Sequence, residues 1–178
     1  MVTLLTEVIK LVLFALPSYF ANAVPVVLGG GKPIDFGANF FDKRRILGDG
    51  KTIRGFVAGV VAGTLAGGIE GYVLYQSEFA FYPTPMLFLI SGFLLSLGTM
   101  FGDLGGSFIK RRMGMNRGQP SIILDQLFFF LFALLFVVPL APSILSAEGV
   151  AFLFILTYVL HVFFNFAANR LGLKRVPW

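Results

Sequence analysis

The sequence of 178 residues contains no cysteine and a single histidine, His161. The lack of cysteine excludes a disulfide framework, a zinc knuckle and a thiolate nucleophile, and one histidine excludes a multi-histidine metal site within one chain. Charged residues are scarce too, at 13%, whereas a typical soluble domain has about 25%. Apolar residues make up 57% of the chain, and 22 of them are Phe. This composition indicates a membrane protein whose chemistry uses carboxylates, amides, lysine and arginine.

Five stretches have the roughly 20 mainly apolar residues that a membrane-spanning helix needs. They lie at about 4–28, 53–75, 85–109, 119–141 and 149–170. We therefore predict an all-α fold, a single integral-membrane domain over 1–178 with five transmembrane helices and with termini on opposite sides. The first stretch has Glu7 and Lys10 near its start and no small-residue cleavage site, so we expect it to stay in the mature protein.

The basic residues are distributed very unevenly over the loops. All lysines and arginines except Lys10 lie in 29–54, in 110–118 or in the C-terminal segment from Arg170, whereas the loops at 76–84 and 142–148 have none. By the positive-inside rule, the N-terminus lies outside and the C-terminus in the cytoplasm of a multi-pass protein of the cell membrane.

The segment 29–54 is long for a connection between two helices. Its glycines are mixed with Phe36, Phe40 and Phe41, a composition too apolar for a disordered segment. We predict a folded binding loop on the cytoplasmic face, in which Asp35, Asn39 and Asp42 either contact a sugar or a base or only solvate the loop.

Two aspartates, Asp103 and Asp125, fall within the third and fourth predicted spans. Each lies eleven residues from Gly114, the midpoint of the helical hairpin, so both carboxylates are expected at a similar depth. Facing carboxylates repel each other unless a cation lies between them, and such hard oxygen ligands suit Mg²⁺. The alternative is that these aspartates form structural ion pairs with Lys110 and Arg117.

The third span continues this polar pattern towards its cytoplasmic end. Asp103, Ser107 and Lys110 share one helical face at spacings of four and three, and Arg111 follows. An acid, a hydroxyl and cations together near a membrane surface indicate a phosphate site.

A second basic cluster lies where the long loop meets the second span. It contains Gly48, Gly50, Lys51, Thr52 and Arg54. Backbone amides exposed by glycine, cations and a helix N-terminus together form an anion receptor. A Walker A loop is excluded, because its first glycine would fall on Arg45. The alternative for this cluster is a basic membrane anchor followed by a capped helix start.

Three segments together carry a family resemblance. They are Asn22-Ala23-x-Pro25-Val26, Leu47-Gly48-Asp49-Gly50-Lys51-Thr52-Ile53-Arg54-Gly55, and Gly102-Asp103-Leu104-Gly105-Gly106-Ser107-Phe108-Ile109-Lys110-Arg111-Arg112 with Asp125 downstream. In these the chain resembles the CDP-archaeol synthases, archaeal membrane cytidylyltransferases, over essentially its whole length. It is also similar to the larger CDP-diacylglycerol synthases in Ser107-x-x-Lys110-Arg111, but it lacks their Pro-Gly-His-Gly-Gly segment and has Gln126 where they have Arg.

The resemblance implies transfer of CMP from CTP to unsaturated archaetidic acid, an isoprenoid ether-lipid phosphate, forming CDP-archaeol and pyrophosphate. The catalytic residues would be Asp103, Asp125, Lys110 and Arg111, with Mg²⁺ on the two aspartates. The substrate-binding residues would be Lys51, Thr52, Arg54, Gly48, Gly50, Ser107, Asn22 and Asn39. The partners are CTP, the lipid and the bilayer; a homodimer is compatible with the sequence, and no nucleic acid is implied.

Two other functions stay open at this point. One is a CDP-diacylglycerol synthase-like enzyme acting on phosphatidic acid, and the other is a transporter for an anionic or phosphorylated solute. A transport path predicts charge through the outer half of the membrane and inverted repeats. Only Glu7, Lys10 and Glu70 are charged there, and no repeat is visible.

Overall fold

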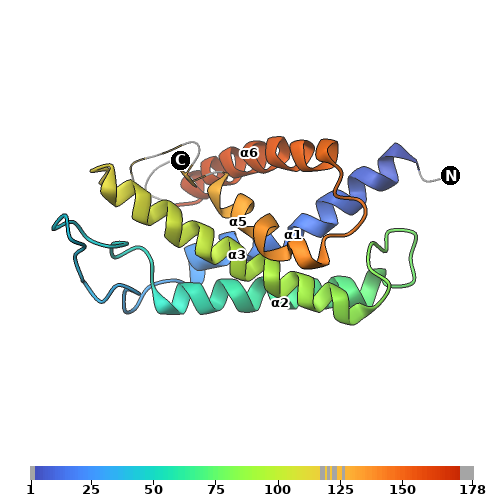
Figure 1. Cartoon of the computed structure of the whole chain (residues 1–178), viewed down its shortest axis with the longest axis horizontal. Coiled ribbons are helices and arrows are strands. Elements are labelled where there is room, and N and C mark those ends of the chain that lie inside the picture. Colours follow the sequence, from blue (N-terminus) through green and yellow to red (C-terminus); the bar gives the residue numbers. More distant parts are fainter. Residues whose placement is uncertain (1–2, 117–118, 120, 122–123, 126, 173–178) are drawn as a thin grey trace.

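The computed structural model describes residues 3–116, 119, 121, 124–125 and 127–172. In chain order, the helices are α1 (Leu4–Leu28), α2 (Ile53–Leu74), α3 (Pro85–Arg112), α5 (Phe128–Val137), the 3₁₀ helix η1 (Val138–Leu140) and α6 (Ala147–Arg170). The residues described form no strand. Figure 1 shows α2 and α3 side by side, with α1 crossing behind them and α6 on the opposite side of the bundle.

Four helices, α1, α2, α3 and α6, are long and apolar enough to cross a membrane, and Phe128–Leu140 forms a shorter apolar helix. The spans predicted at 4–28, 53–75, 85–109 and 149–170 agree with the four long helices to within a few residues. The span predicted at 119–141 lies partly outside the described residues. The all-α membrane architecture is confirmed, and the fifth full-length span stays a prediction.

Each long helix begins at a hydroxyl side chain that caps it. The Oγ atoms of Thr3, Thr52, Thr84 and Ser146 accept a hydrogen bond from the backbone N–H three residues further on. The first turn of a helix leaves its N–H groups without intrahelical partners, and near a membrane few waters replace them. The caps therefore explain why the helices begin where they do.

A stripe of glycines lets α2 lie almost in backbone contact with α1 and α3. A Cβ atom at Gly63 would lie 2.4 Å from the carbonyl oxygen of Pro17 on α1, and one at Gly67 would lie 2.6 Å from that of Phe88 on α3. In lipid, where apolar side chains gain little by leaving the solvent, helices associate through this kind of close packing. The stripe fixes α3, which carries much of the candidate site, against α2.

Polar side chains also link the helices inside the bundle. Ser18 on α1 and Thr99 on α3 are both buried, and their hydroxyl oxygens lie 2.7 Å apart. Tyr19 on α1 and Thr157 on α6 are joined in the same way, at 2.9 Å. Hydrogen bonds between helices satisfy hydroxyl groups that would otherwise be stranded in an apolar interior.

The two ends of the bundle differ in charge. The loop between α1 and α2 (residues 29–52, hereafter the 29–52 loop) lies at the same end as the C-terminal ends of α3 and α6, while α1 begins at the other end (Figure 1). The basic segments identified in the sequence therefore share one end.

We predict that Gly67→Ala destabilises the bundle, because its new methyl group would meet the backbone of α3. Overpacking of this kind costs about 1–3 kcal/mol, and it would appear as easier unfolding by SDS, followed by circular dichroism in detergent.

Gly68→Ala is the matched control, since its Cβ would approach only the flexible Leu89 side chain, at 3.2 Å. Equal stability of the two variants would contradict backbone packing at Gly67.

Candidate phosphate-binding site

The 29–52 loop is folded by its own backbone hydrogen bonds. Ile34 N–H donates to Lys51 C=O at 2.8 Å and Ile53 N–H to Lys32 C=O at 3.1 Å, so the two ends of the loop pair with each other. Further out, Phe40 N–H donates to Arg44 C=O at 2.8 Å. The prediction that this apolar, glycine-containing segment is ordered agrees with these pairings.

The outer part of the loop is held against the C-terminal end of α3. Arg44 donates to the carbonyl oxygen of Arg112 at 2.6 Å, and Arg112 pairs with Asp42 at 2.8 Å. The Arg112 guanidinium also lies over the rings of Phe40 and Phe108, 5.0 and 4.8 Å from their centroids. The last carbonyls of a helix lack intrahelical partners, and here the loop's arginine supplies one.

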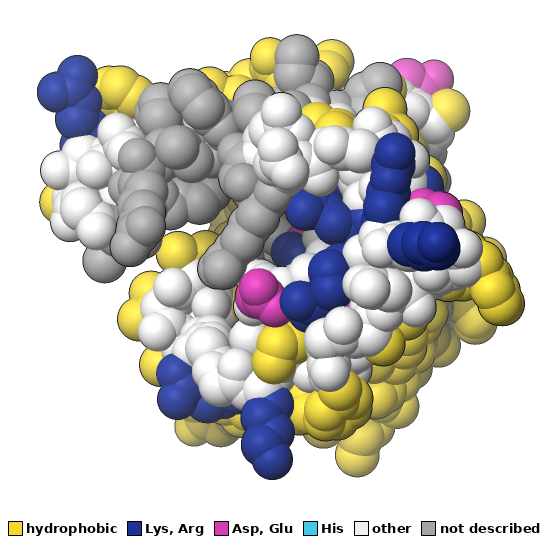
Figure 2. Space-filling view, turned by 90° about the vertical axis from the view of Figure 1, so that its left-hand side faces the viewer, with side chains coloured by type: hydrophobic (Ala, Val, Ile, Leu, Met, Phe, Trp, Pro, Cys, Tyr) yellow, Lys and Arg dark blue, Asp and Glu magenta, His cyan; other side chains and the backbone are white. Residues whose placement is uncertain are grey.

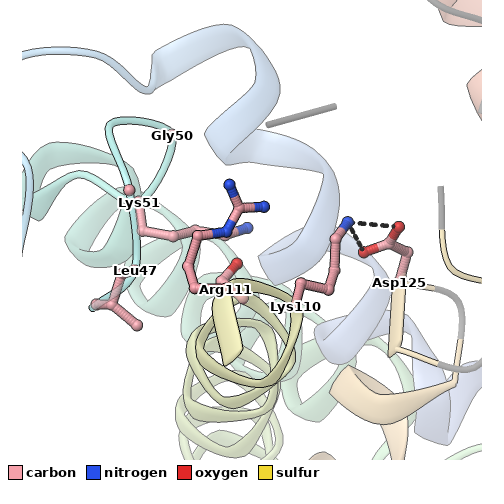
Figure 3. Close-up of a pocket in the computed structure, with 8 residues that line it drawn as sticks. Leu47, Gly50, Lys51, Lys110, Arg111 and Asp125 are labelled. Carbon is pink, nitrogen blue, oxygen red and sulfur yellow. Dashed lines mark hydrogen bonds and ion pairs between the residues drawn. The ribbon is translucent and has the colours of Figure 1, made fainter. Parts of the chain in front are cut away.

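Between the loop and α3 lies a pocket of about 150 Å³. It is lined by Leu47, Gly48, Gly50 and Lys51 from the loop, by Ser107, Lys110 and Arg111 from α3, and by Asp125. Figure 3 shows the loop residues on one side and Lys110 with Asp125 on the other, with Arg111 between them. The two basic clusters identified in the sequence, one at the end of the loop and one at the end of α3, therefore lie side by side around this pocket.

Two lysines of the site are each paired with an aspartate. Lys51 Nζ lies 2.5 and 2.6 Å from the carboxylate oxygens of Asp103. Lys110 Nζ, which is buried, lies 2.8 and 2.9 Å from those of Asp125. Part of the alternative prediction, the pair of Asp125 with Lys110, is therefore present, whereas Arg117 lies outside the described residues.

The two carboxylates lie at a similar depth, as predicted from the hairpin. A Cβ atom at Gly102 would meet Phe129 Cα, and one at Gly106 would meet Leu124 C=O. Because the two segments run antiparallel, Asp103 and Asp125 are within about one helical turn of the same level.

Arg111 is the cation best placed to receive an anion. One of its terminal nitrogens donates to Asn116 C=O at 3.2 Å, and among the described residues its buried Nε has no hydrogen-bond partner. Figure 2 shows lysine and arginine side chains gathered around this end of the molecule. Among the described lining residues the pocket thus gathers three cations and a hydroxyl, groups of the kind that bind phosphate.

The carboxylates fit a magnesium ion that arrives with phosphate groups better than one bound by the protein alone. No group of three or more metal-ligating His, Cys, Asp or Glu side chains exists among the described residues. Mg²⁺ usually takes only one or two carboxylates and completes its shell with water and substrate phosphates. Asp125 lines the pocket and Asp103 does not, and each of the two carboxylates predicted to bind magnesium is paired with a lysine.

Four of the predicted binding residues do not line the pocket. The Thr52 hydroxyl caps α2, and Arg54 donates to the carbonyl oxygens of Leu28 and Gly29 at the end of α1. Asn22 is half-buried within α1, and Asn39 is exposed in the outer part of the loop, where its backbone pairs with that of Arg45. Thr52 and Arg54 therefore set the path by which the chain enters α2.

Leu47 was not predicted as a site residue, and Asp35 was predicted only as a possible contact for a sugar or a base. Leu47 lines the pocket, and the buried Asp35 carboxylate accepts hydrogen bonds from both Leu47 and Gly48. The one local signal for Asp35 is Gly37 two residues later, a spacing typical of an aspartate that turns the backbone. Nothing local indicates its contacts twelve and thirteen residues further along the chain.

A bundle of apolar membrane-length helices with a basic, carboxylate-containing pocket at one end defines the class of the protein: a multi-pass membrane protein with a charged pocket at the end of its helices. Over residues 1–178, the sequence matches the family described as CarS-like: CDP-archaeol synthase. The chain belongs to the CDP-archaeol synthase family.

Relatives and a solved structure agree with this assignment. The chain is 46% identical to the CDP-archaeol synthase of Thermococcus gammatolerans over 93% of each chain, and 46% identical to that of Archaeoglobus fulgidus over 98% of this chain and 100% of that one. It is also similar to a structure described as "Structural insight into an intramembrane enzyme for archaeal membrane lipids biosynthesis". The TM-score is 0.76 and the identity 38%, covering 86% of this chain and 91% of the other.

We predict that Arg111→Gln weakens the binding of inorganic pyrophosphate. A hydrogen bond to a charged group contributes about 1.5–3 kcal/mol, so the dissociation constant should rise about tenfold or more. Isothermal titration of the detergent-solubilised protein measures this change.

Arg170→Gln serves as the control, because Arg170 is an exposed arginine that lies against Phe166 at the end of α6 and does not line the pocket. If both variants bind pyrophosphate as weakly as each other, the effect comes from general charge and the assignment of Arg111 is wrong.

Proposed function

We propose that this chain transfers CMP from CTP to unsaturated archaetidic acid (2,3-bis-O-(geranylgeranyl)-sn-glycerol 1-phosphate), forming CDP-archaeol and pyrophosphate. The observation that carries the proposal is the pocket between the 29–52 loop and α3, where Lys51, Lys110 and Arg111 meet beside Ser107. A reaction between a membrane lipid and a water-soluble nucleotide needs such a site at the end of the helices. The CDP-archaeol synthase family, to which the chain belongs, is named for the same product.

The transfer of CMP depends more on the alignment of the two substrates and on neutralisation of their phosphate charges than on proton transfer. A phosphate monoester has a second pKa near 6 and is largely dianionic at neutral pH. One of its oxygens forms a bond to the α-phosphorus of CTP, the bond from that phosphorus to the bridging oxygen of the β-phosphate breaks, and pyrophosphate leaves with the electron pair. No general base is required, which fits a pocket whose lining residues include no histidine.

The cations of the pocket have two tasks in this reaction. They bring two anions together, which repel each other in water, and they stabilise the charge that develops on the leaving pyrophosphate. Lys51, Lys110 and Arg111 are the residues proposed for both tasks, and Ser107 is proposed as a hydroxyl donor to a phosphate oxygen. The ion pairs keep the two lysines extended towards the pocket.

Asp103 and Asp125 are proposed to hold Mg²⁺ that enters with the nucleotide. The metal would neutralise phosphate charge and help to align the reacting groups. In the ligand-free chain each aspartate is bound to a lysine. Binding would therefore exchange partners, so that the carboxylates move to the metal and the lysines to the phosphates.

We place the site at the cytoplasmic face of a protein with five transmembrane helices, N-terminus outside and C-terminus inside. Support comes from the position of the 29–52 loop and the ends of α3 and α6 at one end of the bundle. Positively charged loops stay preferentially in the cytoplasm. CTP is available on the cytoplasmic side. The homodimer stays a prediction.

The proposal predicts Mg²⁺-dependent incorporation of α-labelled CTP into the ether-lipid phosphate, with release of pyrophosphate. Removal of the metal with EDTA should abolish incorporation, and Asp103→Asn should lower it about a hundredfold or more, because a charge contact in the transition state is lost. Glu78→Gln, which removes an exposed carboxylate from the loop between α2 and α3 and does not touch the pocket, is the control.

Phosphatidic acid, supplied in a parallel reaction, separates the two lipid substrates. Preference for phosphatidic acid would move the protein to the CDP-diacylglycerol type of reaction. Absence of label with both lipids, in folded protein that still binds CTP, would overturn the proposed function.

The orientation can be tested directly because the chain contains no cysteine. In intact cells, a membrane-impermeant maleimide should label the Gln76→Cys variant. It should label the Lys32→Cys variant only after the cells are permeabilised. Both positions are exposed, and they lie in the loops at the two ends of the bundle. The reverse labelling pattern would place the pocket outside the cell.

A further inference from the structure

The carboxylate of Asp35 accepts hydrogen bonds from several parts of the 29–52 loop. Its side chain is fully buried although the loop is mostly exposed. One oxygen accepts from Gly37 N–H at 3.1 Å and from the Arg45 guanidinium at 2.7 Å. The other accepts from Leu47 N–H at 2.9 Å and from Gly48 N–H at 2.8 Å.

These contacts keep Asp35 ionised. Burial by itself raises the pKa of a carboxyl group, but the hydrogen bonds from Arg45 and from the backbone of Gly48, Leu47 and Gly37 outweigh it. The net effect lowers the pKa of Asp35 well below its ordinary value. A carboxylate that stays charged holds its donors with charge-assisted hydrogen bonds, which are stronger than neutral ones.

The groups that Asp35 holds are part of the pocket wall. Leu47 and Gly48 both line the pocket, and Lys51, which pairs with Asp103, follows three residues later. Gly48 has φ of +94°, a conformation that only glycine adopts at little cost. Arg45 also pairs with Asp49 at 2.7 Å, so that it connects Asp35 to the tip of the same segment.

We propose that Asp35 is a positioning residue for the nucleotide, because its carboxylate fixes the Leu47–Gly48 backbone so that Gly48, Gly50 and Lys51 face the phosphates of CTP. Asp35 does not line the pocket, so it acts through these residues. This inference rests on the proposed cytidylyl transfer.

The geometry favours the nucleotide over the lipid as the substrate that the loop holds. The 29–52 loop lies beyond the start of α2 and beside the last turns of α3, at the end of the molecule where lysine and arginine side chains gather (Figures 1 and 2). A water-borne nucleotide approaches from that side. A lipid phosphate remains attached to chains within the bilayer and approaches from the helix side of the pocket, where Ser107 and Lys110 lie.

The test is steady-state kinetics of Asp35→Asn with each substrate varied in turn. An amide of the same size keeps one acceptor oxygen and turns an N–H₂ group towards donors, so the Leu47–Gly48 segment loses its fixed position. Loss of an outer positioning contact weakens a site about 10- to 100-fold. We expect the KM for CTP to rise by at least about tenfold, while the KM for the lipid phosphate changes by less than about twofold.

Glu78→Gln is the control. Glu78 is an exposed carboxylate in the loop between α2 and α3, at the opposite end of the bundle, and it does not line the pocket. This variant should keep both KM values within about twofold. Hydrogen exchange gives a second readout: the amides of Leu47 and Gly48 should exchange faster in Asp35→Asn and not in Glu78→Gln.

The outcomes separate this inference from the proposed function. If the protein without any substitution shows no cytidylyl transfer, the proposed function itself is wrong. An active protein in which Asp35→Asn only lowers kcat and thermal stability, with both KM values kept, shows a structural role and overturns the inference. Equal increases in both KM values overturn the assignment of the loop to the nucleotide.

Discussion

The ion pair between Lys51 and Asp103 connects the two halves of the site. A carboxylate near the end of a membrane helix is costly to leave uncompensated, and its partner here comes from a loop, 52 residues earlier in the chain. The loop must therefore lie over α3 to supply that lysine. The contacts of Arg44 and Arg112 hold it there, and the pocket is the space left between loop and helix.

The same arrangement explains how several cations are kept together in a small volume. Lys51 and Lys110 each lie against an aspartate, so two of the three cations of the pocket are neutralised before any anion binds. When substrates bind, the phosphate groups would replace the aspartates as partners of the lysines, and a divalent metal ion would replace the lysines as partner of the aspartates. Under the proposed function the site would exchange one balanced set of charges for another, which would avoid a large desolvation cost in either state.

The glycine stripe of α2 holds α3, which carries part of this site, in close contact with α2. Because Gly63 and Gly67 admit the backbones of α1 and α3, the three helices are close-packed over much of their length. On α3, Gly102 and Gly106 admit Phe129 and Leu124 in the same way, which brings Asp125 beside Lys110. Small residues thus set both the distance between helices and the position of a charged partner.

The sequence alone determined the four long helices, the basic end and the composition of the two basic clusters, because apolar length, loop charge and residue spacing are local properties of the chain. It did not determine which cation each carboxylate contacts: Lys51 binds Asp103, and Arg54 binds the end of α1 instead of lining the pocket. Nor did it indicate that Asp35 holds Leu47 and Gly48. Only the tertiary structure decided these pairings, because they depend on how a long loop folds back over a helix, and that path is set by contacts between residues distant in the sequence.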